Sequence, residues 1–362
     1  MANKHMPYDL KQMQSLPLEA KNIMSEQRIV QWFEYWDGQV YVSFSGGKDS
    51  TVLADLCAKV CKRYGWTLYM LFVNTGLEYP EIQKFVKEYA EYLRQTYAIE
   101  VELTIIRPEM RFDEVIKKHG YPVISKAVSQ VIKTAKYNKN TYRYQMIEGT
   151  AKDKEGNKSI FNIPQWKFLI DAPFDTSSRC CDVMKKTPIR QYEKETRRKP
   201  IIGTMAQESR NRYISWMKNG CNAFETKKPI SQPLSFWTEQ DVLYYIKKYN
   251  VPYCSVYGDI VVDEKVDGDN VIEGQMNIVD YLGCHTEEDK LKTTGCNRTG
   301  CIFCMFGCHL EKEPNRFQRL KETHPRQYEY CIGGGEMVDG KLQPNKEGLG
   351  LGKVLDYIGV KY

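Results

Sequence analysis

A short stretch near the N-terminus, SFSGGKDS at residues 43–50, carries the groups that bind phosphate. Two glycines let a backbone approach a ligand closely, two serines offer hydroxyl donors, and a lysine adds positive charge: Gly46, Gly47, Ser45, Ser50 and Lys48. Between a strand and a helix, such a loop presents backbone amides and a helix N-terminus to an anion. The spacing differs from the GxxxxGK[ST] of Walker A. The segment predicts a phosphate-binding loop; the alternative is an ordinary strand-to-helix turn.

The elements that position this loop are predicted from hydrophobic periodicity. Residues 40–44 favour a strand, and the residues from Asp49 to Gly65 favour a helix. Further strands are predicted at 67–73, 100–106 and 200–205, and further helices near 80–96, from about Gln207 to Gly220, and after a cap formed by Thr238 and Asp241. Alternating strands and helices predict an α/β fold with a doubly wound, Rossmann-like parallel sheet.

Composition narrows the class of protein. The chain has 362 residues, 42% hydrophobic and 27% charged, and no apolar stretch approaches the roughly 20 residues that cross a bilayer. The first residues lack the apolar region of a signal peptide, so we expect a soluble, cytoplasmic protein without membrane partners. Because disulfides are rare in that reducing compartment, the 12 cysteines favour metal ligands or redox thiols. The net charge of +6 is compatible with an anionic ligand and decides little else.

Changes of pattern along the chain suggest four parts. Residues 1–20 form an N-terminal extension and residues 20–257 the α/β domain. Residues 258–283 are acidic and mixed in pattern, which suggests an insertion, and residues 284–362 are rich in cysteine and glycine. We expect this last part to be a small subdomain held together by a metal.

Several ordered motifs together resemble one family. The loop SGGKDS is followed by VNTGLEYPE at 73–81, HGYPVISK at 119–126, GTMAQESR at 203–210 and PISQPLSFWTEQDVLYY within 230–257. This series resembles the PP-loop nucleotide α-hydrolase superfamily and, within it, the iron–sulfur branch of the phosphoadenosine phosphosulfate (PAPS) reductase family. The resemblance spans about residues 40–310 and implies the adenine nucleotide α-hydrolase type of fold.

The resemblance also implies which residues bind the nucleotide. They are the loop residues and two later segments: Ser43, Ser45, Gly46, Gly47, Lys48, Asp49, Ser50, Asn74, Thr75, Gly76, Gly203, Glu208, Ser209 and Arg210. Of these, Lys48, Asp49 and Ser50 are the expected catalytic residues. Two positions depart from the family pattern, because Asn74 stands where the family has aspartate and Met205 where it has arginine.

The cysteines predict a metal centre. Cys180 and Cys181, in SSRCCDVMKKTP, resemble the CC-x-x-x-K-x-x-P signature of the iron–sulfur members, and Cys301 and Cys304 form a later C-x-x-C. We expect these four to hold an iron–sulfur cluster, most simply [4Fe–4S], beside the nucleotide site. Zinc is the alternative because it also accepts four thiolates, and Cys296 and Cys308 flank the C-x-x-C at zinc-like spacing. His309 is a weaker candidate ligand.

Two basic segments suggest further partners. Five basic residues and no acidic ones lie between Lys126 and Arg143, and seven basic residues lie between Lys185 and Lys199. The first segment is suited to nucleic acid, and Lys185 and Lys186, directly after the cysteine pair, are suited to a phosphate or sulfate group. The alternative for both segments is a solvated helix face.

These observations support three hypotheses. The first is an enzyme that uses Mg²⁺ and cleaves ATP between the α and β phosphates to adenylate an acceptor, for sulfur transfer or thiomodification of nucleic acid, with a protein as sulfur donor or reductant. The intact loop favours it, because the resemblance implies a degraded loop and a C-terminal cysteine in the family's reductases. The second is a reductase of adenylyl sulfate or PAPS, for which Cys308 is the only candidate nucleophile. The third is a zinc-stapled nucleic-acid-binding protein without turnover.

Overall fold

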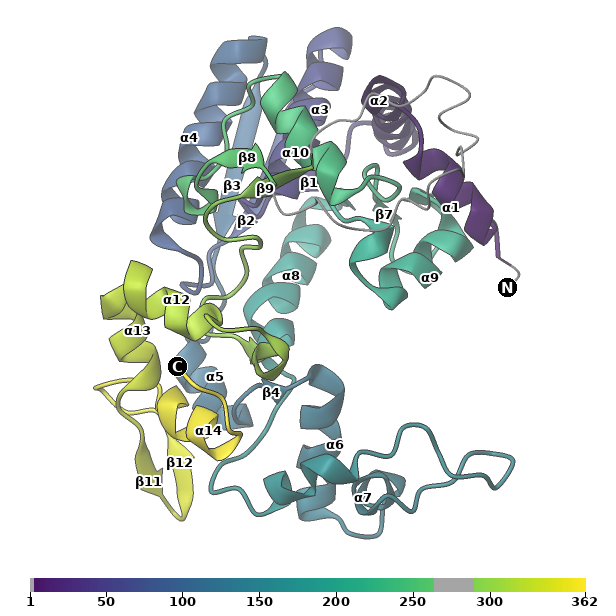
Figure 1. Ribbon diagram of the computed structural model, residues 1–362. Coiled ribbons are helices and arrows are strands. Elements are labelled where there is room, and N and C mark those ends of the chain that lie inside the picture. The colour runs from purple at the N-terminus through teal and green to yellow at the C-terminus, as the bar shows by residue number, and fades with distance from the viewer. Residues whose placement is uncertain (1–2, 264–289) are drawn as a thin grey trace, which may run out of the picture. The chain divides into compact units, whose positions relative to one another are not determined.

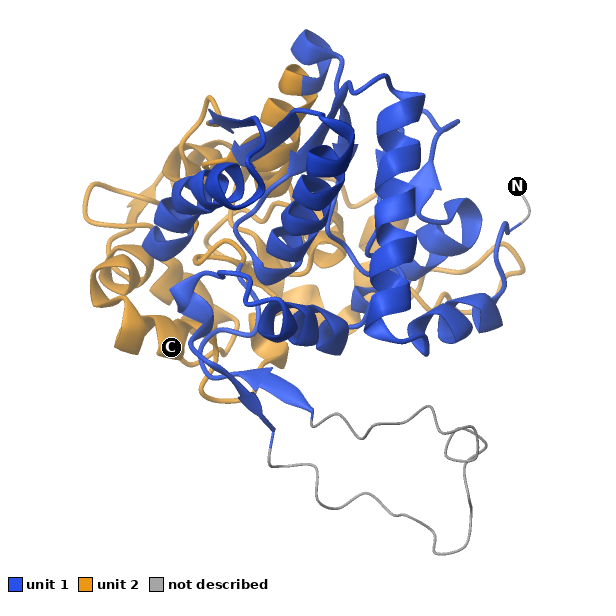
Figure 2. Ribbon diagram, turned by 90° about the horizontal axis from the view of Figure 1, so that it is seen from above, with its two compact units in different colours: residues 1–72, 79–106, 193–299 blue, residues 73–78, 107–192, 300–362 orange. Residues whose placement is uncertain are grey.

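The computed structural model describes residues 3–263 and 290–362 (Figure 1). The chain forms two compact units (Figure 2). Unit 1 comprises Met1–Phe72, Tyr79–Ile106 and Glu193–Thr299, and unit 2 comprises Val73–Glu78, Arg107–Tyr192 and Gly300–Tyr362. The units interleave along the chain, so that the cysteine pair and the C-x-x-C, more than 100 residues apart, belong to the same unit.

Unit 1 is built on a six-stranded sheet in the order β3-β2-β1-β5-β7-β6. The strands are β1 (Val40–Ser43), β2 (Leu68–Val73), β3 (Val101–Ile106), β5 (Lys199–Ile201), β6 (Asn222–Ala223) and β7 (Ile230–Ser231). β1 pairs in parallel with both β2 and β5, β5 pairs in parallel with β7, and β6 runs antiparallel at the edge. The chain proceeds outward from β1 to β3 and then returns to the other side of β1. This is a doubly wound α/β sheet whose order reverses between β1 and β5.

The helices of unit 1 are amphipathic and cover this sheet. They are α1 (Pro7–Gln14), α2 (Leu18–Tyr35), α3 (Lys48–Tyr64), α4 (Pro80–Tyr97), α9 (Arg210–Asn219) and α10 (Glu239–Lys248), with short turns η3 (Ala206–Glu208) and η4 (Ser255–Tyr257). α3 follows the predicted phosphate loop directly and packs against α2, α4 and α10, which leaves twelve of its residues buried. The helix that presents the loop is therefore fixed on several sides.

Most of the predicted elements of unit 1 are confirmed, with two corrections. The strand predicted at 200–205 is present but shorter, because β5 spans Lys199–Ile201. The helix predicted from Gln207 begins at Arg210, because the Ser209 hydroxyl accepts a hydrogen bond from the Arg212 amide and caps it there. The predicted cap of α10 is confirmed, since Thr238 and Asp241 bond to each other's backbone amides. Of the suggested insertion 258–283, residues 264–283 lie outside the described residues; β8 (Ile260–Val262) pairs antiparallel with β9 (Leu291–Thr293) around it.

Unit 2 is mainly helical. Its helices are α5 (Phe112–His119), α6 (Lys126–Tyr137), α7 (Tyr142–Glu148), α12 (Arg316–Thr323), α13 (Pro325–Ile332) and α14 (Leu351–Tyr357). Short turns are η1 (Pro164–Ile170), η6 (Cys308–Leu310) and one π-helical turn, η2 (Asp182–Lys186), which continues into α8 (Thr187–Thr196), the helix that crosses the boundary between the units. None of the described helices is long and apolar enough to span a membrane.

Two short parallel strands organise the centre of unit 2. β4 (Val123–Ile124) pairs with β10 (Met305–Phe306), and the Gly307 amide donates to the Ile124 carbonyl at 2.9 Å. A separate hairpin joins β11 (Glu336–Val338) and β12 (Lys341–Gln343). Because β10 follows the C-x-x-C directly and β4 precedes α6, this pairing brings Cys304 towards the first turn of α6.

Candidate functional site

The predicted phosphate loop, residues 43–50, follows β1 at the point where the sheet order reverses. Ligands of doubly wound sheets bind there, beyond the carboxyl ends of the strands. Gly46 adopts φ +71°, and a Cβ on it would lie 2.9 Å from the Ile82 side chain. A Cβ on Gly203, after β5, would lie 2.8 Å from the Asp49 carbonyl oxygen. The two loops that meet at this edge therefore approach each other backbone to backbone.

Two serines hold the loop in shape. The Ser50 hydroxyl donates to the Gly47 carbonyl at 2.9 Å and accepts from the Ser45 amide at 3.2 Å. The two serine hydroxyls lie 3.0 Å apart, and the Gly47 amide donates to Ser45 Oγ at 3.3 Å. The hydroxyls thus determine the loop's conformation as well as offering groups to a ligand.

Lys48 is the buried cation of this site. Its side chain is 5% exposed, and its ammonium donates to the Asn297 carbonyl at 3.0 Å and pairs with Glu239 at 3.0 Å. Its backbone amide donates to the Tyr257 hydroxyl at 3.1 Å. Asp49, the next residue, has one buried carboxylate oxygen with no hydrogen-bond partner among the described residues, although the Lys48 ammonium lies 3.9 Å from it. Burial raises the pKa of Asp49.

These groups line a polar cavity of about 190 Å³ in unit 1. The sequence-predicted residues Ser45, Gly47, Lys48, Asp49, Gly203 and Glu208 all line it. Among the other predicted residues, Ser43 ends β1, Gly46 and Ser50 shape the loop, and Ser209 caps α9. Arg210, in the first turn of α9, is exposed and is not among the lining residues.

Five residues that the sequence analysis did not single out also line the cavity: Thr204, Arg212, Tyr257, Arg298 and Thr299. Three of them come from segments far from the loop, so no local pattern could place them there. Arg212 lies two residues beyond the motif GTMAQESR, in the first turn of α9, and no separate sequence signal indicated its position in the cavity.

Asn74, Thr75 and Gly76 belong to unit 2. The Thr75 amide and hydroxyl both donate to the buried Glu78 carboxylate, at 3.0 and 2.7 Å, and Asn74 accepts from the Gly76 amide at 3.0 Å. Thr75 and Gly76 line a second cavity of about 160 Å³ together with unit 2 residues that include Arg111 and Tyr330.

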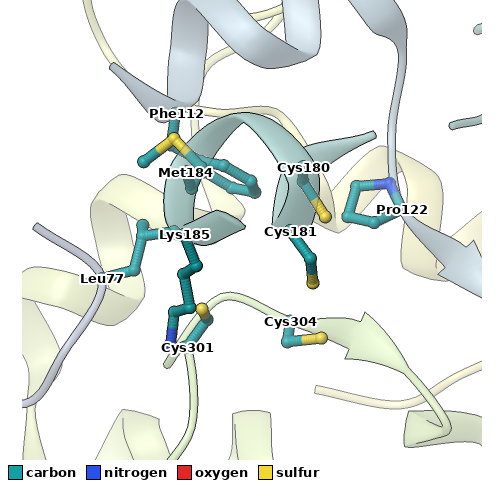
Figure 3. Close-up of a pocket in the computed structure, with 9 residues that line it drawn as sticks. All are labelled: Leu77, Phe112, Pro122, Cys180, Cys181, Met184, Lys185, Cys301 and Cys304. Carbon is teal, nitrogen blue, oxygen red and sulfur yellow. The ribbon is translucent and has the colours of Figure 1, made fainter. Parts of the chain in front are cut away.

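The four predicted metal ligands line one small cavity in unit 2 (Figure 3). Cys180 and Cys181 lie directly before the π-helical turn η2, and Cys301 and Cys304 lie in the segment before β10. The Cys304 amide donates to the Cys301 carbonyl at 3.1 Å, which makes a tight turn of the C-x-x-C. Among the described residues, no three His, Cys, Asp or Glu side chains are arranged closely enough to hold a single metal ion.

Two lysines lie beside these thiols. A hydrogen bond from Cys180, together with Lys126 and Lys185, lowers the pKa of Cys181 to about 6. The same hydrogen bond raises the pKa of Cys180. Burial raises the pKa of Cys301 to about 11 although Lys185 lies near it. Lys185 is also 3.7 Å from Glu78. A set of soft thiol donors flanked by cations suits an anionic metal–thiolate centre.

The remaining candidates lie elsewhere. Cys308 is buried, and burial raises its pKa to about 11. The His309 ring packs edge-on against Trp166 at 5.3 Å. Cys296 belongs to unit 1, where its thiol lies 3.7 Å from the Tyr79 hydroxyl. None of these three residues lines the cysteine cavity.

A doubly wound α/β sheet with a glycine loop at its switch point is the architecture of proteins of the PP-loop class. The model of the phosphoadenosine phosphosulfate reductase domain matches residues 39–168 and 162–305, and the chain belongs to this family. Curated protein sequences give no significant match.

Two solved structures show distant likeness. NMN synthetase from Francisella tularensis is 14% identical, with 66% of this chain and 72% of that chain covered and a TM-score of 0.31. The U34-tRNA thiolase NcsA from Methanococcus maripaludis with its [4Fe-4S] cluster is 16% identical, with 65% of this chain and 66% of that chain covered and a TM-score of 0.32. The family assignment rests on the sequence match.

Proposed function

We propose that this protein is an ATP pyrophosphatase of the PAPS reductase family that adenylates an acceptor for sulfur transfer. The observation that supports it is the polar cavity of unit 1. There the complete SGGKDS loop, the buried ammonium of Lys48 and the arginines Arg212 and Arg298 lie together at the switch point of the sheet. A site with this many cations is suited to the polyphosphate of a nucleotide.

The proposed reaction has two steps. An oxygen of the acceptor attacks the α-phosphorus of ATP, a new P–O bond forms, and the bond to the β-phosphate oxygen breaks as pyrophosphate leaves. A hydrosulfide or protein persulfide then attacks the activated carbon of the acceptor, a C–S bond forms, and AMP departs with the acceptor oxygen. Where the nucleophile is a persulfide, a thiol reductant then cleaves the S–S bond of the disulfide that forms, which leaves the sulfur on the acceptor. A nucleic-acid base with a carbonyl oxygen is an acceptor of suitable chemistry, with a sulfur-carrying protein as donor.

The loop residues have separate roles in this scheme. Backbone amides of the loop and the Lys48 ammonium stabilise the negative charge that develops on the leaving pyrophosphate. Asp49 presents a carboxylate to the Mg²⁺ that accompanies ATP, which offsets the cost of its burial. Ser50 keeps the loop in its binding conformation through the Gly47 carbonyl.

The cysteine cavity fits a metal–sulfur centre by its donor set. Cys180, Cys181, Cys301 and Cys304 would hold an iron–sulfur cluster, with zinc as the alternative metal. When bound, a cluster would supply electron-transfer or Lewis-acid chemistry to the sulfur-transfer step. Lys126 and Lys185 provide positive charge around it.

The second candidate is a sulfonucleotide reductase, which the family match favours. Such an enzyme needs an accessible thiolate to attack the sulfur of adenylyl sulfate or PAPS. Cys308 is buried, and its pKa is raised to about 11, so the thiolate is disfavoured there. This observation ranks the reductase behind the pyrophosphatase.

Titration calorimetry distinguishes the two. Anaerobically purified protein is titrated with Mg·ATP, adenylyl sulfate and PAPS, and release of pyrophosphate and sulfite is assayed in parallel. We expect the tightest binding for Mg·ATP and loss of that binding in the Ser45→Ala, Lys48→Ala double variant. Tighter binding of a sulfonucleotide, with sulfite release, would replace the proposal with the reductase.

A further inference from the structure

Arg298 reaches the nucleotide cavity from a segment that no nucleotide motif includes. It lies between β9 and Cys301, and its guanidinium is 3.0 Å from a Glu208 carboxylate oxygen. The side chain is 69% exposed, yet it lines the same cavity as Lys48 and Gly203. The guanidinium is thus both directed to the cavity and accessible from solution.

The residues on either side of Arg298 are attached to the phosphate loop. The Asn297 carbonyl accepts from the Lys48 ammonium at 3.0 Å. The Thr299 hydroxyl is 2.9 Å from the Tyr257 hydroxyl, which in turn accepts from the Lys48 amide. These contacts fix the backbone of Arg298 relative to the loop, so the position of its guanidinium is determined by the fold.

Glu208 holds two guanidiniums together. Arg212 pairs with one oxygen of this carboxylate and Arg298 with the other. Burial and, after it, the positive charge of Arg298 lower the pKa of Arg212. One carboxylate therefore pairs directly with two arginines, and Asp49 is a further negative charge near them. An anion with several oxygens is the group that could bridge both guanidiniums.

The position of Met205 adds a second argument. The family resemblance places an arginine there, but Met205 is 3% exposed and carries no charge. The Met205 amide donates to Glu208 at 2.8 Å, so this turn contributes to holding the carboxylate. Arg298 pairs with the same carboxylate from another part of the chain.

We propose that Arg298 is a phosphate-binding residue whose guanidinium binds the pyrophosphate part of a nucleoside triphosphate, and that Glu208 is the positioning residue for Arg298 and Arg212. This inference rests on the proposed function and deepens it. It makes the β and γ phosphates the feature by which the site selects its substrate. A nucleoside monophosphate lacks the groups that Arg298 binds.

The test is calorimetry on the full chain with Mg·ATP, inorganic pyrophosphate and AMP. Arg298→Ala is expected to weaken binding of ATP and pyrophosphate by at least about 10-fold, because it removes a charge-assisted hydrogen bond, and to leave AMP binding unchanged. Arg298→Lys is expected to recover part of the loss, since it restores charge without the guanidinium fork. Arg63→Ala is the matched control, because Arg63 is 57% exposed, pairs with Glu26 at 2.8 Å and lies at the opposite end of α3.

The outcomes separate this inference from the proposed function. If the wild type binds Mg·ATP, Lys48→Ala abolishes that binding and Arg298→Ala does not change it, the role of Arg298 is refuted and the proposed function stands. If Arg298→Ala weakens AMP as much as ATP, its effect is structural and the inference is likewise overturned. If the wild type binds neither ATP nor pyrophosphate, the proposed function fails, and the inference fails with it. Equal melting temperatures of Arg298→Ala and Arg63→Ala establish that both variants are folded.

Discussion

The Tyr257 hydroxyl accepts a hydrogen bond from the Lys48 amide at 3.1 Å and lies 2.9 Å from the Thr299 hydroxyl. One phenol thus joins the predicted phosphate loop to the segment that carries Arg298. Tyr257 and Lys48 are buried, so water does not readily replace the hydroxyl as the partner of the Lys48 amide. The relationship makes the two segments energetically dependent on each other.

A double-mutant cycle measures that dependence. Tyr257→Phe and Thr299→Val should each lower the free energy of unfolding by about 1 kcal/mol, because each removes the hydrogen bond between the two hydroxyls. The double variant should lose about 0.5–1 kcal/mol less than the sum, since both changes remove the same hydrogen bond. Urea unfolding of the four proteins gives the coupling, and Tyr8→Phe, at a 65% exposed tyrosine, should be neutral. Strict additivity would show that the hydroxyl pair contributes nothing.

Gly46 and Gly38 provide a second comparison. Both adopt nearly the same left-handed conformation, φ +71° and +69°, so alanine costs about 1 kcal/mol of backbone strain at either position. Only at Gly46 does the added Cβ meet a neighbour, Ile82 at 2.9 Å, while Gly38 has open space. Gly46→Ala should therefore be the more destabilising variant and should lose ATP binding, and Gly38→Ala should bind ATP normally. Calorimetry and thermal unfolding of both variants provide the measurement, and equal ATP affinities would contradict the loop geometry.

The raised pKa of Asp49 predicts a trade between stability and binding. A carboxylate whose pKa is higher in the folded than in the unfolded protein takes up protons on folding. Its charged form therefore lowers the free energy of unfolding, and this cost grows as the pH rises through the ordinary carboxylate range and above. Asp49→Asn should raise the melting temperature by about 2 °C at pH 7 and should lose this advantage near pH 3. The same variant should lose the Mg²⁺ dependence of ATP binding. A melting temperature at pH 7 below that of the wild type would contradict the assignment of Asp49 as a desolvated charge.

Local sequence signals were sufficient to predict the loop. They were not sufficient to predict which distant segments contact it. The strand before Gly46, the glycines and the helix after Asp49 each have a pattern that acts over a few residues, and all three were predicted. Arg298 and Tyr257 reach the cavity through the folding of distant segments, which periodicity does not encode. The start of α9 was misplaced because helix propensity extends to Gln207, whereas the Ser209 cap decides the boundary.

The basic segment 126–143 shows the same limit. As a run of charges, it suggested a nucleic-acid surface or a solvated helix. In the structure the Lys133 ammonium donates to the His119 carbonyl at 3.0 Å and the Lys136 ammonium to the Ala172 carbonyl at 2.8 Å. Long apolar stems let lysines satisfy buried backbone groups, and the sequence gives no sign of which carbonyls they reach.

Iron binding tests the cysteine cavity. Cys181→Ala and Cys304→Ala should each abolish the iron and the visible absorbance of anaerobically reconstituted protein, because each removes a ligand of the proposed cluster. Cys331→Ala is the matched control, since Cys331 is a fully buried cysteine of the same unit that does not line the cavity. Elemental analysis for iron and zinc distinguishes the two metals. Full iron in Cys304→Ala would remove it from the ligand set.

Lys126 provides the last prediction, which concerns the charge around that centre. Its ammonium hydrogen-bonds Cys181 and helps to lower the pKa of that thiol, so it stabilises negative charge on the sulfur. A more negative, reduced centre gains more from this cation than an oxidised one, and Lys126→Ala should therefore shift the reduction potential to a more negative value while leaving the iron content unchanged. Lys139→Ala, at an exposed lysine beyond the C-terminus of the same helix, should leave the potential where it is. Anaerobic redox titration followed by absorbance measures both variants, and an unchanged or more positive potential in Lys126→Ala would exclude Lys126 as an electrostatic partner of the centre.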